Sequence, residues 1–142
     1  MLSILDDIIT ELGKVTFPVT VLIRDSEDES EMSYPQVVVS EISTIPSSID
    51  SISGGLEEYS TALGYQIDVQ TQAAIVVEED VDVVYNKKQI GQMILAICDS
   101  ALFSKFLLQR RSVNGMKIDD VTYRTIGRYE NVMTLDNIAY RP

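Results

Sequence analysis

Apolar and polar residues alternate most regularly over residues 63–72, which have the sequence LGYQIDVQTQ. One side of an extended chain would carry Leu63, Tyr65, Ile67 and Val69. A period of two predicts a strand with one buried face and one polar face. We expect this strand to lie at the centre of a sheet, with its apolar face under helices.

Two stretches have the three- and four-residue spacing of apolar side chains that predicts a helix with one buried stripe. The first is residues 2–12, and the second is about residues 80–104, with Asp80 or Asp82 as its N-cap. The apolar stripe of the longer helix contains Ile90, Met93, Ile94, Ile97, Ala101 and Leu102. We also expect close packing at Gly91, because glycine inside a helix is unfavourable by about 1 kcal/mol relative to alanine.

The first half of the chain contains two further predicted strands. Val15–Arg24 alternates loosely, and Pro18 has no N–H to donate, so this strand should begin late or lie at a sheet edge. Gln36–Ile42 is rich in valine and follows Tyr34-Pro35, which suits the entrance of a strand. Residues 43–55 are rich in serine and glycine and predict a long loop.

The C-terminal third predicts more strands. Residues 106–111 form either a short strand or an irregular arm, and Asn114-Gly115 predicts a tight turn. Val121–Tyr129 and Val132–Arg141 follow as two strands, and the link Glu130-Asn131 is short enough for a hairpin.

This order of elements predicts an α+β fold with a mostly antiparallel or mixed β-sheet and two helices packed on one face. The length of 142 residues fits one domain, so we expect residues 1–142 to form a single domain. No apolar run approaches the roughly 18 residues of a membrane span, and the N-terminus lacks a basic leader. We therefore expect no membrane contact and synthesis in the cytoplasm.

Charge is distributed unevenly along the chain. The net charge is −11; residues 1–82 hold 17 acidic and 2 basic side chains, whereas residues 83–142 hold 5 and 9. Opposite charge on two parts of one chain favours head-to-tail association of copies. The plainer interpretation is that these charges keep the protein soluble. No basic stripe with interleaved aromatic residues indicates nucleic-acid binding.

The sequence lacks the residues that common catalytic sites need. Histidine is absent, which removes the usual general base and metal ligand, and no phosphate-binding glycine loop is present. Cys98 lies in an apolar helical stretch, where we expect it to be part of the core. The acidic segment Asp25–Glu31 lacks the glycine that a calcium loop requires, so we expect a solvated loop. We expect no catalytic residue, cofactor or metal site, although a magnesium site made of carboxylates alone is left open.

Several landmarks occur in an order that resembles the tail terminator family of long-tailed bacteriophages, also called tail completion or head–tail joining proteins. These landmarks are an N-terminal helix, Tyr34-Pro35 entering a valine-rich strand, the strand Tyr65–Val69, a long helix, and the pairs Tyr123-Arg124 and Tyr140-Arg141. The acidic loop and the long segment 43–55 depart from the pattern.

The resemblance implies a structural virion protein located at the head–tail interface. Such proteins form homo-oligomeric rings, typically hexamers, that cap the tail tube, end its polymerisation and meet the head connector. DNA would pass through the channel without specific binding, and an acidic lining would repel its phosphates. The alternatives are a neck or connector adaptor, a tail tube subunit and, less favoured, a small carboxylate-dependent metal enzyme.

We expect four groups of residues to supply subunit or partner contacts. The acidic group is Asp25, Glu27, Asp28, Glu29 and Glu31, and the loop group is Ile45, Ile49 and Ile52. The polar strand face is Gln66, Asp68 and Gln70, and the basic group is Lys105, Arg110, Arg111 and Lys117. The plainer interpretation is that the charged groups are solvated and that the isoleucines pack on their own subunit.

Overall fold

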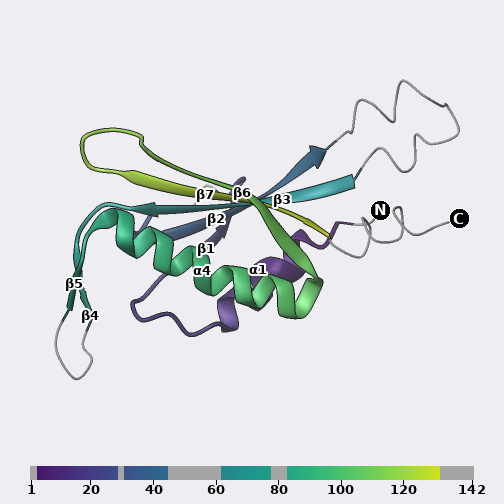
Figure 1. Cartoon of the computed structure of the whole chain (residues 1–142), viewed down its shortest axis with the longest axis horizontal. Coiled ribbons are helices and arrows are strands. Elements are labelled where there is room, and N and C mark those ends of the chain that lie inside the picture. The colour runs from purple at the N-terminus through teal and green to yellow at the C-terminus, as the bar shows by residue number, and fades with distance from the viewer. Residues whose placement is uncertain (1–2, 29–30, 45–61, 78–82, 132–142) are drawn as a thin grey trace, which may run out of the picture.

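A five-stranded sheet organises the protein (Figure 1). The computed structural model describes residues 3–28, 31–44, 62–77 and 83–131. The sheet contains β1 (Leu22–Asp25), β2 (Gln36–Thr44), β3 (Ala62–Thr71), β7 (Tyr123–Asn131) and β6 (Leu108–Lys117), in that spatial order. The remaining elements are helices α1 (Leu5–Lys14) and α4 (Lys87–Phe106), and a two-stranded ribbon of β4 (Ile75–Val77) and β5 (Val83–Tyr85).

The alternating stretch forms β3, the middle strand of the sheet, as predicted. It is antiparallel to both neighbours, β2 and β7. Strand β1 is parallel to β2, so the sheet is mixed and the predicted α+β class is correct. Strand β1 begins only at Leu22 and lies at a sheet edge, which confirms the expectation drawn from Pro18.

Both helices cover the same face of the sheet (Figure 1). Their buried side chains meet those of the strands in one core, which contains Ile8, Leu12, Val37, Val39, Tyr65, Ile67, Val69, Ile90, Ile94, Leu95, Cys98, Leu102, Leu108 and Tyr129. The close approach predicted at Gly91 is confirmed, because an added Cβ would lie 2.5 Å from Thr125 Oγ1. Among the described residues, no helix has the length and apolarity needed to cross a bilayer.

The expected start of the long helix is wrong. The described part of the segment before it forms β4 and β5, and Asn86 is the N-cap instead of Asp80 or Asp82. Asn86 Oδ1 accepts a hydrogen bond from the Gln89 N–H at 2.9 Å, and Gln89 Oε1 accepts one from the Asn86 N–H at 2.9 Å. This reciprocal capping box satisfies two donors at the helix start, while the β-branched and aromatic residues Val83–Tyr85 favour an extended chain.

The turn predicted at Asn114-Gly115 is also wrong, because β6 continues through both residues and pairs with β7. The chain reverses at residues 118–122 instead, where Asp119 Oδ1 accepts hydrogen bonds from the N–H groups of Val121 and Thr122, each at 2.7 Å. These bonds lower the pKa of Asp119. Gly115 leaves room for the Tyr123 side chain instead of forming a turn, since a Cβ at this position would clash with Tyr123.

The predicted hairpin at Glu130-Asn131 is likewise wrong, because both residues belong to β7. The hairpin of the structure joins β6 to β7. Residues 132–141, the second predicted strand, lie outside the described residues, as do residues 45–55 of the predicted loop.

Candidate functional site

The polar face of β3 lies on the side of the sheet opposite the helices, which we call the open face. The cross-strand register places Gln66, Asp68 and Gln70 on this side, next to β2 and β7 residues of the same orientation. These three residues therefore come together, as the alternation predicted. Whether they contact another subunit stays a prediction.

An ion pair between Asp68 and Arg124 occupies the middle of the open face. Arg124 Nε donates to Asp68 Oδ1 at 3.2 Å and to Oδ2 at 3.1 Å, and Arg124 Nη2 donates to Oδ2 at 2.6 Å. Asp68 is 6% exposed although it carries a charge. The guanidinium fork supplies the charge-assisted hydrogen bonds that a buried carboxylate requires.

A row of hydrogen bonds extends this pair across four strands. Gln70 Nε2 donates to Asp68 Oδ2 at 3.1 Å, and Gln36 Nε2 donates to Gln70 Oε1 at 2.8 Å. Arg24 Nη1 reaches Gln36 Oε1 at 3.4 Å, and Arg24 Nη2 donates to the carbonyl oxygen of Asp28. We call Arg24, Gln36, Gln70, Asp68 and Arg124 the polar row.

Every member of the polar row forms a hydrogen bond to another member. Several members are also buried, although they lie on the face of the sheet that the helices do not cover. Arg24 is 5% exposed and Gln36 is 1% exposed. Buried networks of this kind fix strand register, because a shift of one residue would leave charged and amide groups without partners. Gln66 lies beside the row and accepts a hydrogen bond from Arg128 Nε at 3.3 Å.

Sequence reasoning found Asp68 and Gln70 but missed Arg24, Gln36 and the role of Arg124. The signal available was weak. Gln36 is a polar residue at the start of a valine run, and Arg24 and Arg124 fall in strand patterns that gave no reason to expect contact with Asp68.

The acidic group surrounds the end of β1. Asp25 Oδ1 accepts a hydrogen bond from the Glu27 N–H at 3.0 Å, which makes a local turn, and Asp28 N–H donates to the Asp25 carbonyl at 3.0 Å. Glu31 is exposed. Glu29 lies outside the described residues, as do Ile45, Ile49 and Ile52. Among the described residues, no three acidic or cysteine side chains gather in a group that could hold a metal ion.

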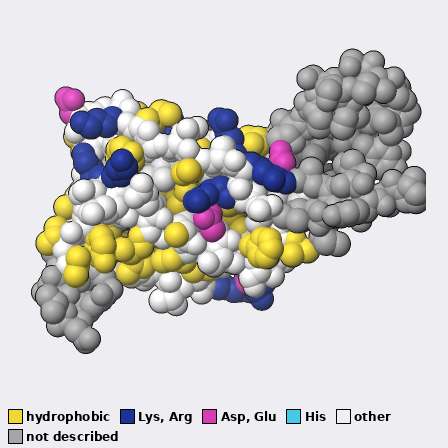
Figure 2. Space-filling view, in the orientation of Figure 1, with side chains coloured by type: hydrophobic (Ala, Val, Ile, Leu, Met, Phe, Trp, Pro, Cys, Tyr) yellow, Lys and Arg dark blue, Asp and Glu magenta, His cyan; other side chains and the backbone are white. Residues whose placement is uncertain are grey.

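The structure does not bring the four basic residues into one patch. Lys105 lies on α4 and pairs with Glu11 at 3.6 Å, while the other three lie along β6. Arg110 pairs with Asp99 at 2.9 Å and Arg111 with Glu130 at 3.3 Å. Lys117 is exposed and takes part in no ion pair of the described residues. Figure 2 shows Lys and Arg side chains along the upper half of the view, where the β6–β7 hairpin runs.

Asp99 also joins α4 to the sheet. It accepts a short hydrogen bond from the Tyr129 hydroxyl while it pairs with Arg110. Burial is the main cause of a raised pKa at Tyr129, and the hydrogen bond to Asp99 raises it further. Burial also raises the pKa of the neighbouring Cys98 thiol to about 12, so the predicted core position of this cysteine is correct and the thiolate is disfavoured.

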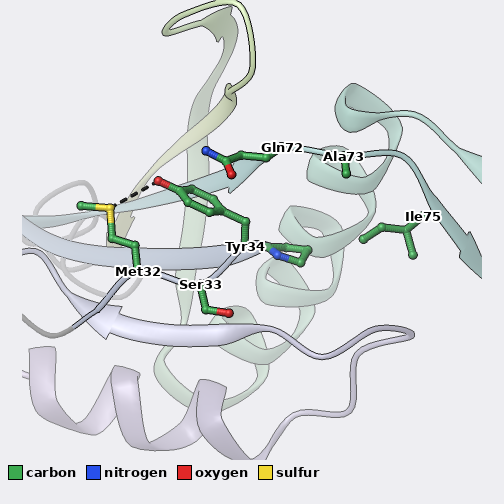
Figure 3. Close-up of a pocket in the computed structure, with 7 residues that line it drawn as sticks. Met32, Ser33, Tyr34, Gln72, Ala73 and Ile75 are labelled. Atoms are coloured by element: carbon green, nitrogen blue, oxygen red, sulfur yellow. Dashed lines mark hydrogen bonds between the residues drawn. The ribbon is translucent and has the colours of Figure 1, made fainter.

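A groove of about 300 Å³ lies beside the entrance of β2 (Figure 3). It is lined by Met32, Ser33, Tyr34, Pro35, Gln72, Ala73 and Ile75, none of which is charged. The Tyr34 hydroxyl lies 3.3 Å from Met32 Sδ. The lining thus offers apolar contact and few hydrogen-bonding groups, and none of its seven residues is a base that could activate the hydroxyl of Ser33 or Tyr34.

Comparison of the chain with protein-family models, curated proteins and solved structures finds no match.

Proposed function

We propose that this chain is a structural virion protein of the tail terminator type. Copies assemble into a ring, hexameric in the family that the sequence resembles, which caps the tail tube of a bacteriophage and ends its polymerisation. The ring joins the tail to the head connector, and DNA passes through its channel without specific binding. The chain would be made in the host cytoplasm and end in the virion.

The contact between Asp68 and Arg124 carries the proposal. Asp68 belongs to the landmark strand Tyr65–Val69, and Arg124 belongs to the landmark pair Tyr123-Arg124. Gln36, which directly follows Tyr34-Pro35, joins the same network through Gln70. Landmarks that were chosen from sequence order alone thus meet in one network, as expected if a shared fold requires them together.

One feature of the described residues and one of the whole sequence add support. The polar row satisfies its own hydrogen bonds and presents no activated nucleophile or base, which suits a packing role. The uneven charge along the chain suits contacts between unlike surfaces of neighbouring copies, the kind of contact that closes into a ring when the rotation allows.

A tail tube subunit and a neck or connector adaptor are the second candidates, because both also assemble through contacts between unlike surfaces of neighbouring copies. Electron microscopy of the purified full chain at high concentration distinguishes a tail tube subunit from a terminator. We expect closed rings or single subunits, whereas long filaments would identify a tube protein. A stoichiometric metal found by elemental analysis would instead favour the carboxylate-dependent enzyme.

A further inference from the structure

Strand β6 presents a long edge to solvent. It lies at one end of the sheet order, and only Leu108 of its ten residues is buried. Within the described residues, β6 pairs with β7 alone. An edge strand of this length offers a row of backbone donors and acceptors to another strand.

The hydrogen bond at the hairpin turn identifies which groups of β6 are available. The Ile118 N–H donates to the Thr122 carbonyl at 2.9 Å, and hydrogen-bonded pairs alternate along an antiparallel ladder. The register therefore places Met116 and Asn114 in bonded pairs with β7. The N–H and C=O groups of the residues between and beside them, Val113, Gly115 and Lys117, point away from β7 toward the open edge.

Strand β1 forms the other edge of the sheet, and its bonding can be assigned in the same way. The N–H groups of Leu22 and Ser26 donate to Pro35 and Val39 in and next to β2, each at 3.1 Å. Because backbone groups alternate in direction along a strand, those of Ile23 and Asp25 point away from β2, and of these the Asp25 carbonyl accepts a hydrogen bond from the Asp28 N–H at 3.0 Å. Both ends of the sheet therefore have outward-facing backbone groups.

The two edges carry opposite charge. Strand β6 contains Arg110, Arg111 and Lys117 and no acidic residue. Strand β1 ends at Asp25 and is followed by Glu27, and its one cation, Arg24, is only 5% exposed and is held in the polar row. Two β6 strands paired antiparallel about Asn114, a register in which the outward-facing Val113 lies opposite Gly115, would place Arg111 opposite Lys117. Like charges in that position destabilise a strand pair, so β6 suits an acidic edge better than a second β6.

We propose that β6 of one copy adds to β1 of a second copy, so that the sheet continues from subunit to subunit. The irregular pairing at Arg111 confines this contact to Ser112–Lys117, beyond the bulge. The contact is head-to-tail, and repeating it generates a closed ring or an open array. The inference rests on the proposed ring function and names the surface that makes the ring.

The variant Val113→Pro tests the backbone contact. The Val113 N–H points outward, so a proline there leaves the β6–β7 ladder intact and removes one donor from the open edge. Sedimentation velocity over a concentration series should show self-association of the wild-type chain, weakened about tenfold or more in the variant. Circular dichroism and urea unfolding verify that the variant is folded.

Lys117→Glu tests the charge. It keeps every backbone donor and removes the only β6 cation that has no carboxylate partner among the described residues. It should weaken association, and a copy carrying Glu27→Lys should restore it when the two are mixed. Reversal of Arg110 or Arg111 is a poorer probe, because each pairs with a carboxylate of its own chain.

Mixing separates head-to-tail pairing from self-pairing of β6. A Val113→Pro copy retains its β1 edge, so small amounts added to wild type should end growing assemblies and lower their average mass. An unchanged mass, association of the variant equal to wild type, or a wild-type chain that stays monomeric up to about 1 mM would each overturn the strand contact. Rings formed by the folded Val113→Pro chain would also overturn it, while leaving the proposed terminator function intact.

Discussion

Replacing Arg124 with methionine should destabilise the protein more than any other single change on the open face. The variant R124M keeps an unbranched side chain over the sheet but leaves the Asp68 carboxylate, of which only 8% is exposed, without its cation. Removal of one partner from a fully buried pair costs about 3–5 kcal/mol, and exposed pairs contribute about 0–1 kcal/mol. The Arg124 side chain is 29% exposed, so we expect an intermediate loss of about 2 kcal/mol.

The exposures also predict an asymmetry between the two partners. D68N leaves a guanidinium that can reach water, so it should cost about 1 kcal/mol, less than R124M. The double variant D68N/R124M should lose less than the two single losses added together, because neither remaining group is a buried charge. Urea unfolding followed by circular dichroism measures all three, and a loss of about 2 kcal/mol corresponds to a midpoint shift of roughly 1 M.

Arg128 provides the matched control for this cycle. It lies on the same face of the same strand but is exposed and contacts Gln66 through one hydrogen bond of 3.3 Å. R128M should change the free energy of unfolding by about 0.5 kcal/mol or less. Equal losses in R124M and R128M, or a larger loss in D68N than in R124M, would refute the reasoning.

Three further predictions concern the core and the helix ends. G91A should lower the free energy of unfolding in urea by about 1–3 kcal/mol, because the added Cβ would lie 2.5 Å from Thr125 Oγ1. Adding T125A should recover part of this loss, and a gain in stability in G91A would contradict the packing. L107G should raise the free energy of unfolding by up to about 1 kcal/mol, because Leu107 caps α4 with φ of 56°, a conformation that glycine adopts freely. A lower free energy of unfolding would contradict this, because the packing of the leucine side chain would then contribute more than the backbone strain costs. The pKa of Cys98 is raised from 9.0 to about 12, so its contribution to stability is complete below pH 9.0 and is lost as pH rises toward 12. The fall in stability across that window should be shallower in C98A by up to about 1.4 kcal/mol per pH unit, and parallel pH profiles would contradict it.

Local patterns predicted the parts of the fold that one periodic face determines. The alternation at Tyr65, Ile67 and Val69 identified the central strand, and Pro18 correctly limited the first strand to a late start at an edge. These features follow from the chain's own side chains and dihedral angles, so they could be derived without knowing which elements pack together.

The errors arose where two local signals competed and packing decided between them. Asn114-Gly115 is a strong turn signal, but the Asp119 turn closes the hairpin, and Gly115 instead gives room to Tyr123. In the same way, Asp80 and Asp82 were reasonable N-caps, yet the reciprocal bonds of Asn86 and Gln89 start the helix later.

The polar row was beyond sequence reasoning for a different reason. Its members come from four strands, and Arg24 and Arg124 are a hundred positions apart in the chain. Only the register of β2, β3 and β7 brings Gln36 to Gln70 and Arg124 to Asp68. A single sequence contains the polar residues but not the pairing that joins them.

The central claim is that copies of this chain form a ring that ends the growth of a tail tube. The most direct measurement is the length of tubes assembled from the tube subunit of the same phage, imaged by electron microscopy with and without the purified full chain. We expect added protein to give shorter tubes with a ring at one end. Tubes of unchanged length without a terminal ring would contradict the claim.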